Sequence, residues 1–132
     1  RVLKIKISIL LINKFLHCHS GNLPIFKGST TIYYYIIMKK KICVSLIEVN
    51  KKIDGGKILY KKFFKNPKKL NDIEKNFDSK IRAIALVSYL KHVKNSKYIK
   101  SKKNYLPYYI AHPLIRQIVM NKNYLIDANS SL

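Results

Sequence analysis

The sequence predicts a small α+β domain, and three features of the chain support this class. Short runs rich in β-branched and aromatic residues, typical of strands, fill much of its first half. All four glycines lie at or before Gly56, so the strongest turn formers are confined to the same part. Residues 57–132 contain no glycine, and their apolar residues increasingly follow helical spacing. We therefore expect strands first and helices afterwards, and 132 residues suit one such domain.

Residues 1–37 are expected to hold strands separated by a loop. Apolar and polar residues alternate over residues 3–11, which is the period-two pattern of a half-buried strand. Residues 17–31 contain two glycines and a proline, and we expect them to form a loop. Residues 31–37 read Thr-Ile-Tyr-Tyr-Tyr-Ile-Ile, and this composition predicts a second strand.

The segment from about 42 to 64 predicts a β-hairpin. Residues 42–49 and 57–64 both have strand composition. Between them lie Asp54, Gly55 and Gly56, which supply residues that tolerate the positive φ angles of a tight turn. We expect the two glycines to adopt those angles.

A long basic helix is expected from about 71 to 95. Asn71 can cap its first turn, Glu74 can complete a capping box, and Asp72 favours the positive end of the helix dipole. The centre of this helix, residues 84–87, is apolar on nearly every face, so a buried strand is the alternative there.

A short C-terminal helix is expected at about 113–121, with Pro113 in its first turn. Composition also shifts along the chain, because residues 1–47 contain no acidic residue. We assign residues 38–132 to a basic α+β nucleic-acid-binding domain. Residues 1–37 are assigned to a separate N-terminal segment of strand and loop, with a leader or a non-native stretch as open alternatives.

The net charge is the strongest indication of a partner. The chain has 27 Lys and Arg residues but only six Asp and Glu, which gives a formal charge of +21. Such a surplus repels itself unless an anionic partner neutralises it, and phosphate groups are the usual partner. RNA is the first expectation and DNA the second, because no helix-turn-helix or zinc-finger pattern appears.

The densest positive charge lies between residues 57 and 103, where aromatic residues are interleaved with the lysines. Lysines can follow a phosphate backbone while tyrosines stack on unpaired bases. Lys is a point charge and Arg is scarce here, so contacts with little base specificity are expected. The candidate nucleic-acid-binding residues are Lys61, Lys62, Lys65, Lys68, Lys69, Lys91, Lys94, Lys97, Tyr98, Lys100, Lys102, Lys103 and Tyr105.

Two short motifs suggest chemistry but do not support it on their own. His17, Cys18 and His19 would place two imidazoles on one face of a strand, with Cys43 as a third ligand. Structural zinc sites need four ligands, so no metal is predicted. Residues 26–30 resemble half of a P-loop in the wrong order, and are expected to be an ordinary loop.

The sequence thus predicts a non-catalytic RNA-binding protein, a component or assembly factor of a ribonucleoprotein particle such as a ribosome, with other proteins of that particle as partners. No catalytic residue and no cofactor are predicted. A peripheral membrane protein held to anionic lipid by its lysines is one alternative, and a basic nuclease or nucleic-acid-modifying enzyme is another. Two unpaired cysteines and the lack of a long apolar run indicate a reducing intracellular compartment without a transmembrane segment. The oligomeric state is left open.

Overall fold

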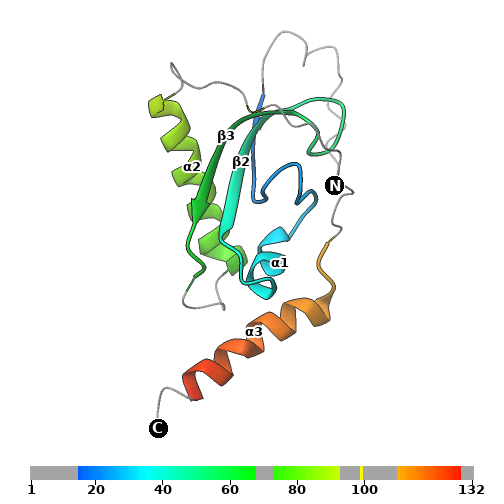
Figure 1. The fold of residues 1–132 in the computed structure, drawn as a ribbon, viewed down its shortest axis with the longest axis vertical. Helices are drawn as coiled ribbons and strands as arrows, with labels where there is room; N and C mark the ends of the chain where they lie inside the picture. Colours follow the sequence, from blue (N-terminus) through cyan, green and yellow to red (C-terminus); the bar gives the residue numbers. More distant parts are fainter. Residues whose placement is uncertain (1–14, 68–72, 93–98, 100–109, 129–132) are drawn as a thin grey trace.

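A computed structural model describes residues 15–67, 73–92, 99 and 110–128 of the chain, and it has the α+β class that the sequence predicts (Figure 1). The strand expected over residues 3–11 lies outside this part. In chain order the elements are β1 (Leu16–His19), α1 (Thr31–Ile37), β2 (Ile42–Glu48), β3 (Lys57–Phe64), the π-helical turn η2 (Ile73–Phe77), α2 (Asp78–His92) and α3 (Pro113–Ala128).

The three strands form one antiparallel sheet in the order β1-β2-β3. The central strand β2 is buried at every position but its last, which explains its continuous run of apolar residues. β2 and β3 form the hairpin expected over residues 42–64, with an irregularity in register between Leu46 and Ile47. β1 pairs with the other edge of β2, so the sheet joins the segments before and after residue 37.

The loop between β2 and β3 differs from the expected tight turn. Asp54 adopts the left-handed conformation, with φ 49°, whereas neither Gly55 nor Gly56 has a positive φ. Gly56 is instead required by a close approach, because a Cβ atom there would overlap the carbonyl oxygen of Glu48. The prediction that the glycines supply the positive φ angles is therefore wrong, and the aspartate does so.

The strand predicted at residues 31–37 is helix α1, and that prediction is wrong. The segment is apolar at almost every position, so its periodicity does not distinguish a helix from a strand. Ile32 and Tyr35 lie one helical turn apart and are both buried in the core. Thr31 donates a hydrogen bond to the carbonyl of Ser20, and the Tyr35 hydroxyl accepts one from the Asn22 N–H. These contacts with the preceding loop outweigh the β-propensity of the side chains.

Helix α2 covers one face of the sheet (Figure 1). Its buried side chains step by four residues, a spacing that places Ile81, Ala85 and Tyr89 on one helical face. Ile73 and Phe77 of η2 precede them at the same spacing and also pack on the core. The apolar centre at residues 84–87 is therefore helical, as expected, and is not a buried strand.

The start of this helix differs from the capping box that the sequence predicts. Asn71 and Asp72 lie outside the described residues. The Glu74 carboxylate accepts a hydrogen bond from the Tyr33 hydroxyl at 3.1 Å and pairs with Arg116 at 3.0 Å. Glu74 thus connects the start of η2 to helices α1 and α3.

Helix α3 extends seven residues beyond the end predicted at 121, and Pro113 occupies its first position. Its first half packs on α1, where Val119 is fully buried, and its second half projects away from the body of the molecule (Figure 1). Within the part of the chain that the structure describes, no helix combines the length and apolar character needed to cross a membrane.

The second face of the sheet is covered by the loop between β1 and α1. Leu23 of this loop is fully buried against Ile47 and Ile58. The Ser45 hydroxyl, at the centre of β2, donates to the Gly21 carbonyl at 2.6 Å and accepts the Leu23 N–H at 3.1 Å. The loop is therefore fixed to the sheet by both apolar and polar contacts.

Candidate active site

Strand β1 places His17 and His19 on the same face of the sheet, because side chains alternate along a strand. Asp54 reaches the same place from the loop between β2 and β3. Its Oδ1 lies 3.4 Å from His19 Nδ1, and the two side chains are 6% and 10% exposed. One nitrogen of each histidine and one Asp54 oxygen all lie within 4.8 Å of one another. We call these three residues the His-His-Asp cluster.

The His19 ring is held in a single orientation by the loop that follows β1. Its Nε2 lies 2.8 Å from the Phe26 carbonyl oxygen, and since a carbonyl only accepts, Nε2 carries the proton of this hydrogen bond. Gly21 lies against the ring, and a Cβ atom there would collide with both the imidazole and the Phe26 carbonyl. In the neutral imidazole, Nδ1 is therefore the unprotonated nitrogen, and it faces Asp54.

Asp54 is oriented by its own backbone and by one hydrogen bond. Its φ of 49° is uncommon for a residue other than glycine, although Asp tolerates it better than most. The Gly28 N–H donates to Oδ2 at 2.7 Å, which leaves Oδ1 directed at His19. The carboxylate thus has one oxygen for structure and the other for the cluster.

Burial sets the protonation state of His19. Loss of solvation lowers the pKa of His19 below its usual 6.5, and the Asp54 charge and the Phe26 carbonyl oppose this shift without reversing it. His19 is therefore neutral near pH 7. A neutral imidazole with a free Nδ1 lone pair beside a carboxylate is an acceptor for one proton.

The β1 backbone that carries the two histidines is held by a residue on the opposite face of the sheet. Arg82 of α2 donates to the Cys18 carbonyl at 3.2 Å and to the Ser20 hydroxyl at 2.8 Å. Its guanidinium also pairs with Asp78 at 2.6 Å. Arg82 therefore fixes the backbone between the two histidines.

His17 forms the accessible side of the cluster. It is partly exposed, whereas His19 is buried, and the two ring centroids are 6.1 Å apart. His17 is therefore the more accessible of the two imidazoles. The arrangement can accept a proton from a bound group and donate a hydrogen bond to it.

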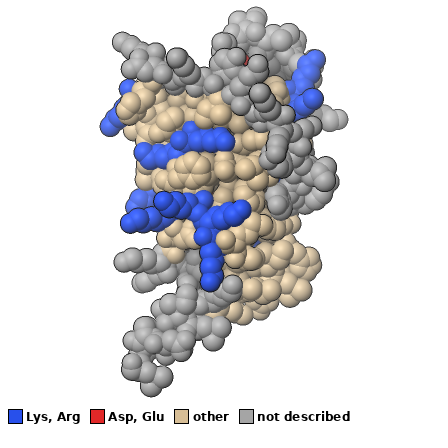
Figure 2. All heavy atoms as spheres, viewed as in Figure 1, with Lys and Arg blue, Asp and Glu red and all other residues tan. Residues whose placement is uncertain are grey.

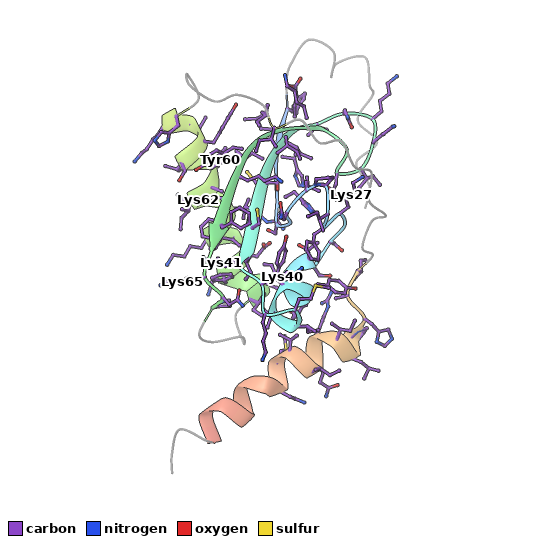
Figure 3. All side chains as sticks on the ribbon, viewed as in Figure 1. Lys27, Lys40, Lys41, Tyr60, Lys62 and Lys65 are labelled. Carbon is purple, nitrogen blue, oxygen red and sulfur yellow. The ribbon has the colours of Figure 1, made fainter. Side chains whose placement is uncertain are left out.

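Only four of the candidate nucleic-acid-binding lysines lie in the part of the chain that the structure describes. Lys61 donates to Asn22 at 2.8 Å, and Lys62, its neighbour on β3, donates to Ser88 of α2 at 2.8 Å. Lys65 lies just beyond β3, near Lys41 in the view of Figure 3. Lys91 lies near the end of α2. The other candidates lie outside the described residues: Lys68, Lys69, Lys94, Lys97, Tyr98, Lys100, Lys102, Lys103 and Tyr105.

Positive charge nevertheless gathers on the visible face of the molecule. Figure 2 shows Lys and Arg side chains in separate groups on this face, with other residues between them. Figure 3 places Lys41, Lys62 and Lys65 on the β3 side and Lys27 toward the opposite side. Nucleic-acid binding by the lysines and tyrosines selected from the sequence stays a prediction.

Sequence reasoning missed the partnership of His17 and His19 with Asp54. The expected third ligand, Cys43, is fully buried in the core. The sequence pattern marks Asp54 only as a turn residue. The sequence feature that could have identified Asp54 is a carboxylate at a turn position that needs positive φ. Its pairing with His19 becomes evident only in the folded structure.

No protein-family model matches the sequence, and curated proteins give no significant match either. Solved structures do resemble the fold. A 4-N formyltransferase from Francisella tularensis superposes with a TM-score of 0.63 at 14% identity, over 92% of this chain and 57% of that protein. A methionyl-tRNA formyltransferase from Clostridium thermocellum gives 0.63 at 19% identity, over 86% and 49%.

A third neighbour is the formyltransferase PseJ from Anoxybacillus kamchatkensis, in complex with UDP-4,6-dideoxy-4-formamido-L-AltNAc and tetrahydrofolate. It gives a TM-score of 0.60 at 15% identity, over 92% of this chain and 63% of PseJ. The chain thus spans about half to two thirds of the length of these neighbours. The fold is one that formyltransferases share.

These neighbours correct the function expected from the sequence. The expectation of a non-catalytic RNA-binding component of a ribonucleoprotein particle is contradicted, because the neighbours described above are formyltransferases. The expectation that the protein is not an enzyme is contradicted by the same finding. A basic surface indicates that a binding partner is negatively charged. It does not indicate whether the protein only binds that partner or catalyses a reaction on it.

Proposed function

We propose that this chain carries the catalytic groups of an N-formyltransferase, with His19 as the general base and Asp54 as its partner. The observation that supports this most is the 3.4 Å approach of His19 Nδ1 to Asp54 Oδ1 in a fold shared with formyltransferases. A buried, oriented and neutral imidazole is what proton removal near pH 7 requires.

Formyl transfer to an amine makes three demands on a site. The amine must lose a proton as its nitrogen attacks the formyl carbon, the carbonyl oxygen gains negative charge, and the departing nitrogen must be protonated. His19 Nδ1 meets the first demand and can return the proton for the third. Once protonated, its two N–H groups face the Phe26 carbonyl and Asp54, so the imidazolium is stabilised on both sides.

His17 is suited to the second demand. It lies on the accessible side of the cluster, where a ring N–H can donate to the formyl oxygen as negative charge develops. Its backbone is fixed because β1 pairs with β2 at this position, opposite Ile47. His17 is therefore the candidate oxyanion donor.

The substrates to test follow from the neighbours. PseJ was solved with tetrahydrofolate and a nucleotide-linked formamido sugar, so a formylated tetrahydrofolate and a nucleotide-linked amino sugar form the first pair. Methionyl-tRNA is the second acceptor, after the other neighbour. Both acceptors carry phosphates, which agrees with a net charge of +21.

The experiment is formation of a formamide product, followed by mass spectrometry. His19→Gln should lower the rate to background, because Gln cannot take the proton. His92→Gln is the matched control: His92 is exposed, its Nδ1 contacts the Ser88 carbonyl of α2, and its loss should leave the rate unchanged. Equal rates for the parent and His19→Gln would exclude the proposed base.

A further inference from the structure

We propose that the His-His-Asp cluster binds a divalent transition-metal ion, with Zn²⁺ as the first candidate. His17, His19 and Asp54 each offer one ligand atom, and these atoms lie within 4.8 Å of one another. Two imidazoles and one carboxylate are a donor set that Zn²⁺ and neighbouring divalent metals accept.

The geometry of the inner pair already fits a shared ion. Two ligands bound at about 2.0–2.1 Å in a tetrahedral site lie about 3.3 Å apart. His19 Nδ1 and Asp54 Oδ1 are 3.4 Å apart. The third ligand atom, on the partly exposed His17, lies within 4.8 Å of both.

The outer contacts of the cluster strengthen the case. Metal-bound histidines usually donate their second ring N–H to a carbonyl or carboxylate, which fixes the tautomer and the ring. His19 Nε2 contacts the Phe26 carbonyl at 2.8 Å, which leaves Nδ1 for the ion. The Gly28 N–H binds Asp54 Oδ2 at 2.7 Å, which leaves Oδ1 for the ion. Both inner ligands are therefore oriented by their non-ligating atoms.

Three protein ligands leave one tetrahedral position open. This is the arrangement of catalytic zinc sites and not of closed structural ones. The partly exposed His17 lies at the open side, so an ion or a small ligand can arrive from solvent. The site is therefore expected to bind metal reversibly and to be emptied by a chelator.

Metal binding does not rest on the proposed formyl transfer, but it would affect it. The ion takes the Nδ1 lone pair of His19, the same lone pair that would accept the proton from an amine. A bound ion therefore withdraws the base. Zn²⁺ should inhibit formyl transfer and EDTA should restore it.

The test uses the 132-residue chain without substrates. Calorimetric titration with ZnCl₂ should show one tight equivalent, and Co²⁺ should give the intense visible absorption of a tetrahedral site. His17→Asn removes the accessible ligand from an already paired strand, so it should fold and should bind Zn²⁺ at least about tenfold more weakly. Asp54→Asn should show the same loss.

The controls are His92→Asn, which removes an exposed imidazole of α2, and Cys18→Ser, which removes the thiol between the two histidines. Both should bind Zn²⁺ as the parent does. Absence of Zn²⁺ binding by the parent would overturn the site. So would equal affinities for the parent and His17→Asn, or a loss in either control that matches the loss in His17→Asn. None of these measurements depends on a formyl donor, so failure of the metal site and failure of the enzyme proposal are distinguishable.

Discussion

The Gly28 N–H donates to Asp54 Oδ2 at 2.7 Å, and both residues have positive φ angles, 101° and 49°. One contact thus joins the loop after β1 to the loop between β2 and β3. It also turns the second carboxylate oxygen toward His19. The backbone conformations of two loops therefore orient Asp54, whereas strand β1 carries the two histidines.

Replacing Asp54 by Asn should abolish formyl transfer with little loss of stability. Asn tolerates a left-handed backbone, and its side-chain oxygen can still accept the Gly28 N–H. Its amide would then face Nδ1 and occupy the lone pair that takes the proton. We expect kcat to fall by roughly 10³–10⁴, as when the carboxylate behind a catalytic histidine is lost. Turnover by Asp54→Asn within tenfold of the parent, at an unchanged Tm, would contradict the assignment.

The activity should depend on pH through His19. Burial lowers its pKa below 6.5, and only the neutral form can accept a proton. kcat/KM should therefore rise with pH through the lowered pKa and be level above about 6.5. Profiles measured from pH 4.5 to 8 would check this, and a limb centred well above 6.5 would assign the base to another group.

The free energy of unfolding should decrease over the same pH range as the pH falls, because proton binding differs between the folded and unfolded chains. Between the lowered pKa of folded His19 and 6.5, the unfolded chain binds a proton that the folded chain does not. The His19 contribution is therefore present above 6.5 and is lost as the pH falls through the folded pKa. Thermal unfolding of the parent and His19→Gln at pH 5 and pH 7 isolates it, since the parent should lose more Tm on acidification.

The sequence predicted those parts of the fold that local patterns determine. The hairpin over 42–64 and the helical character of residues 78–92 follow from composition and spacing. The prediction of a strand over residues 31–37 was wrong because an all-apolar run is compatible with either a strand or a helix. Packing against the loop after β1 determines that the segment is a helix. Local sequence periodicity does not predict contacts between segments that are distant in the chain.

The candidate site depended on such distant contacts. His17 and His19 were recognisable as two side chains on one face of a strand. Their partner lies 35 residues beyond His19, and it joins them only because β1 pairs with β2 and Asp54 adopts a positive φ. Net charge, in contrast, follows from composition alone and needs no fold to be recognised.

The two glycines of the β2–β3 loop should differ in their tolerance of a side chain. A Cβ atom on Gly56 would meet the Glu48 carbonyl oxygen, which belongs to the paired backbone of β2. A Cβ atom on Gly55 would lie 2.7 Å from Cβ of Lys52, so the exposed loop backbone at Lys52 would have to shift, without disturbing a paired strand. Gly56→Ala should lower the free energy of unfolding by about 1–3 kcal/mol, and Gly55→Ala by less. Urea unfolding checks the order, and equal losses would show that the whole loop moves.

The last prediction concerns the brace under the cluster. Arg82 donates to the Cys18 carbonyl and the Ser20 hydroxyl, and its charge pairs with Asp78. Since its side chain is 40% exposed, solvent screens the ion pair, and most of its value should come from the two hydrogen bonds to the β1 side. Arg82→Ala should lower the free energy of unfolding by about 1–2 kcal/mol.

Lys80→Ala is the matched control, because it removes the same charge from an exposed position on the same helix. Any gain from reducing a net charge of +21 is shared by both variants, so their difference isolates the contacts of Arg82. Lys80→Ala should change the free energy of unfolding by no more than about 0.5 kcal/mol. Arg82→Ala should also weaken Zn²⁺ binding, because the Cys18 carbonyl that it holds lies between the two histidine ligands. If Arg82→Ala loses stability but keeps the parent's Zn²⁺ affinity, Arg82 supports the fold without positioning the cluster.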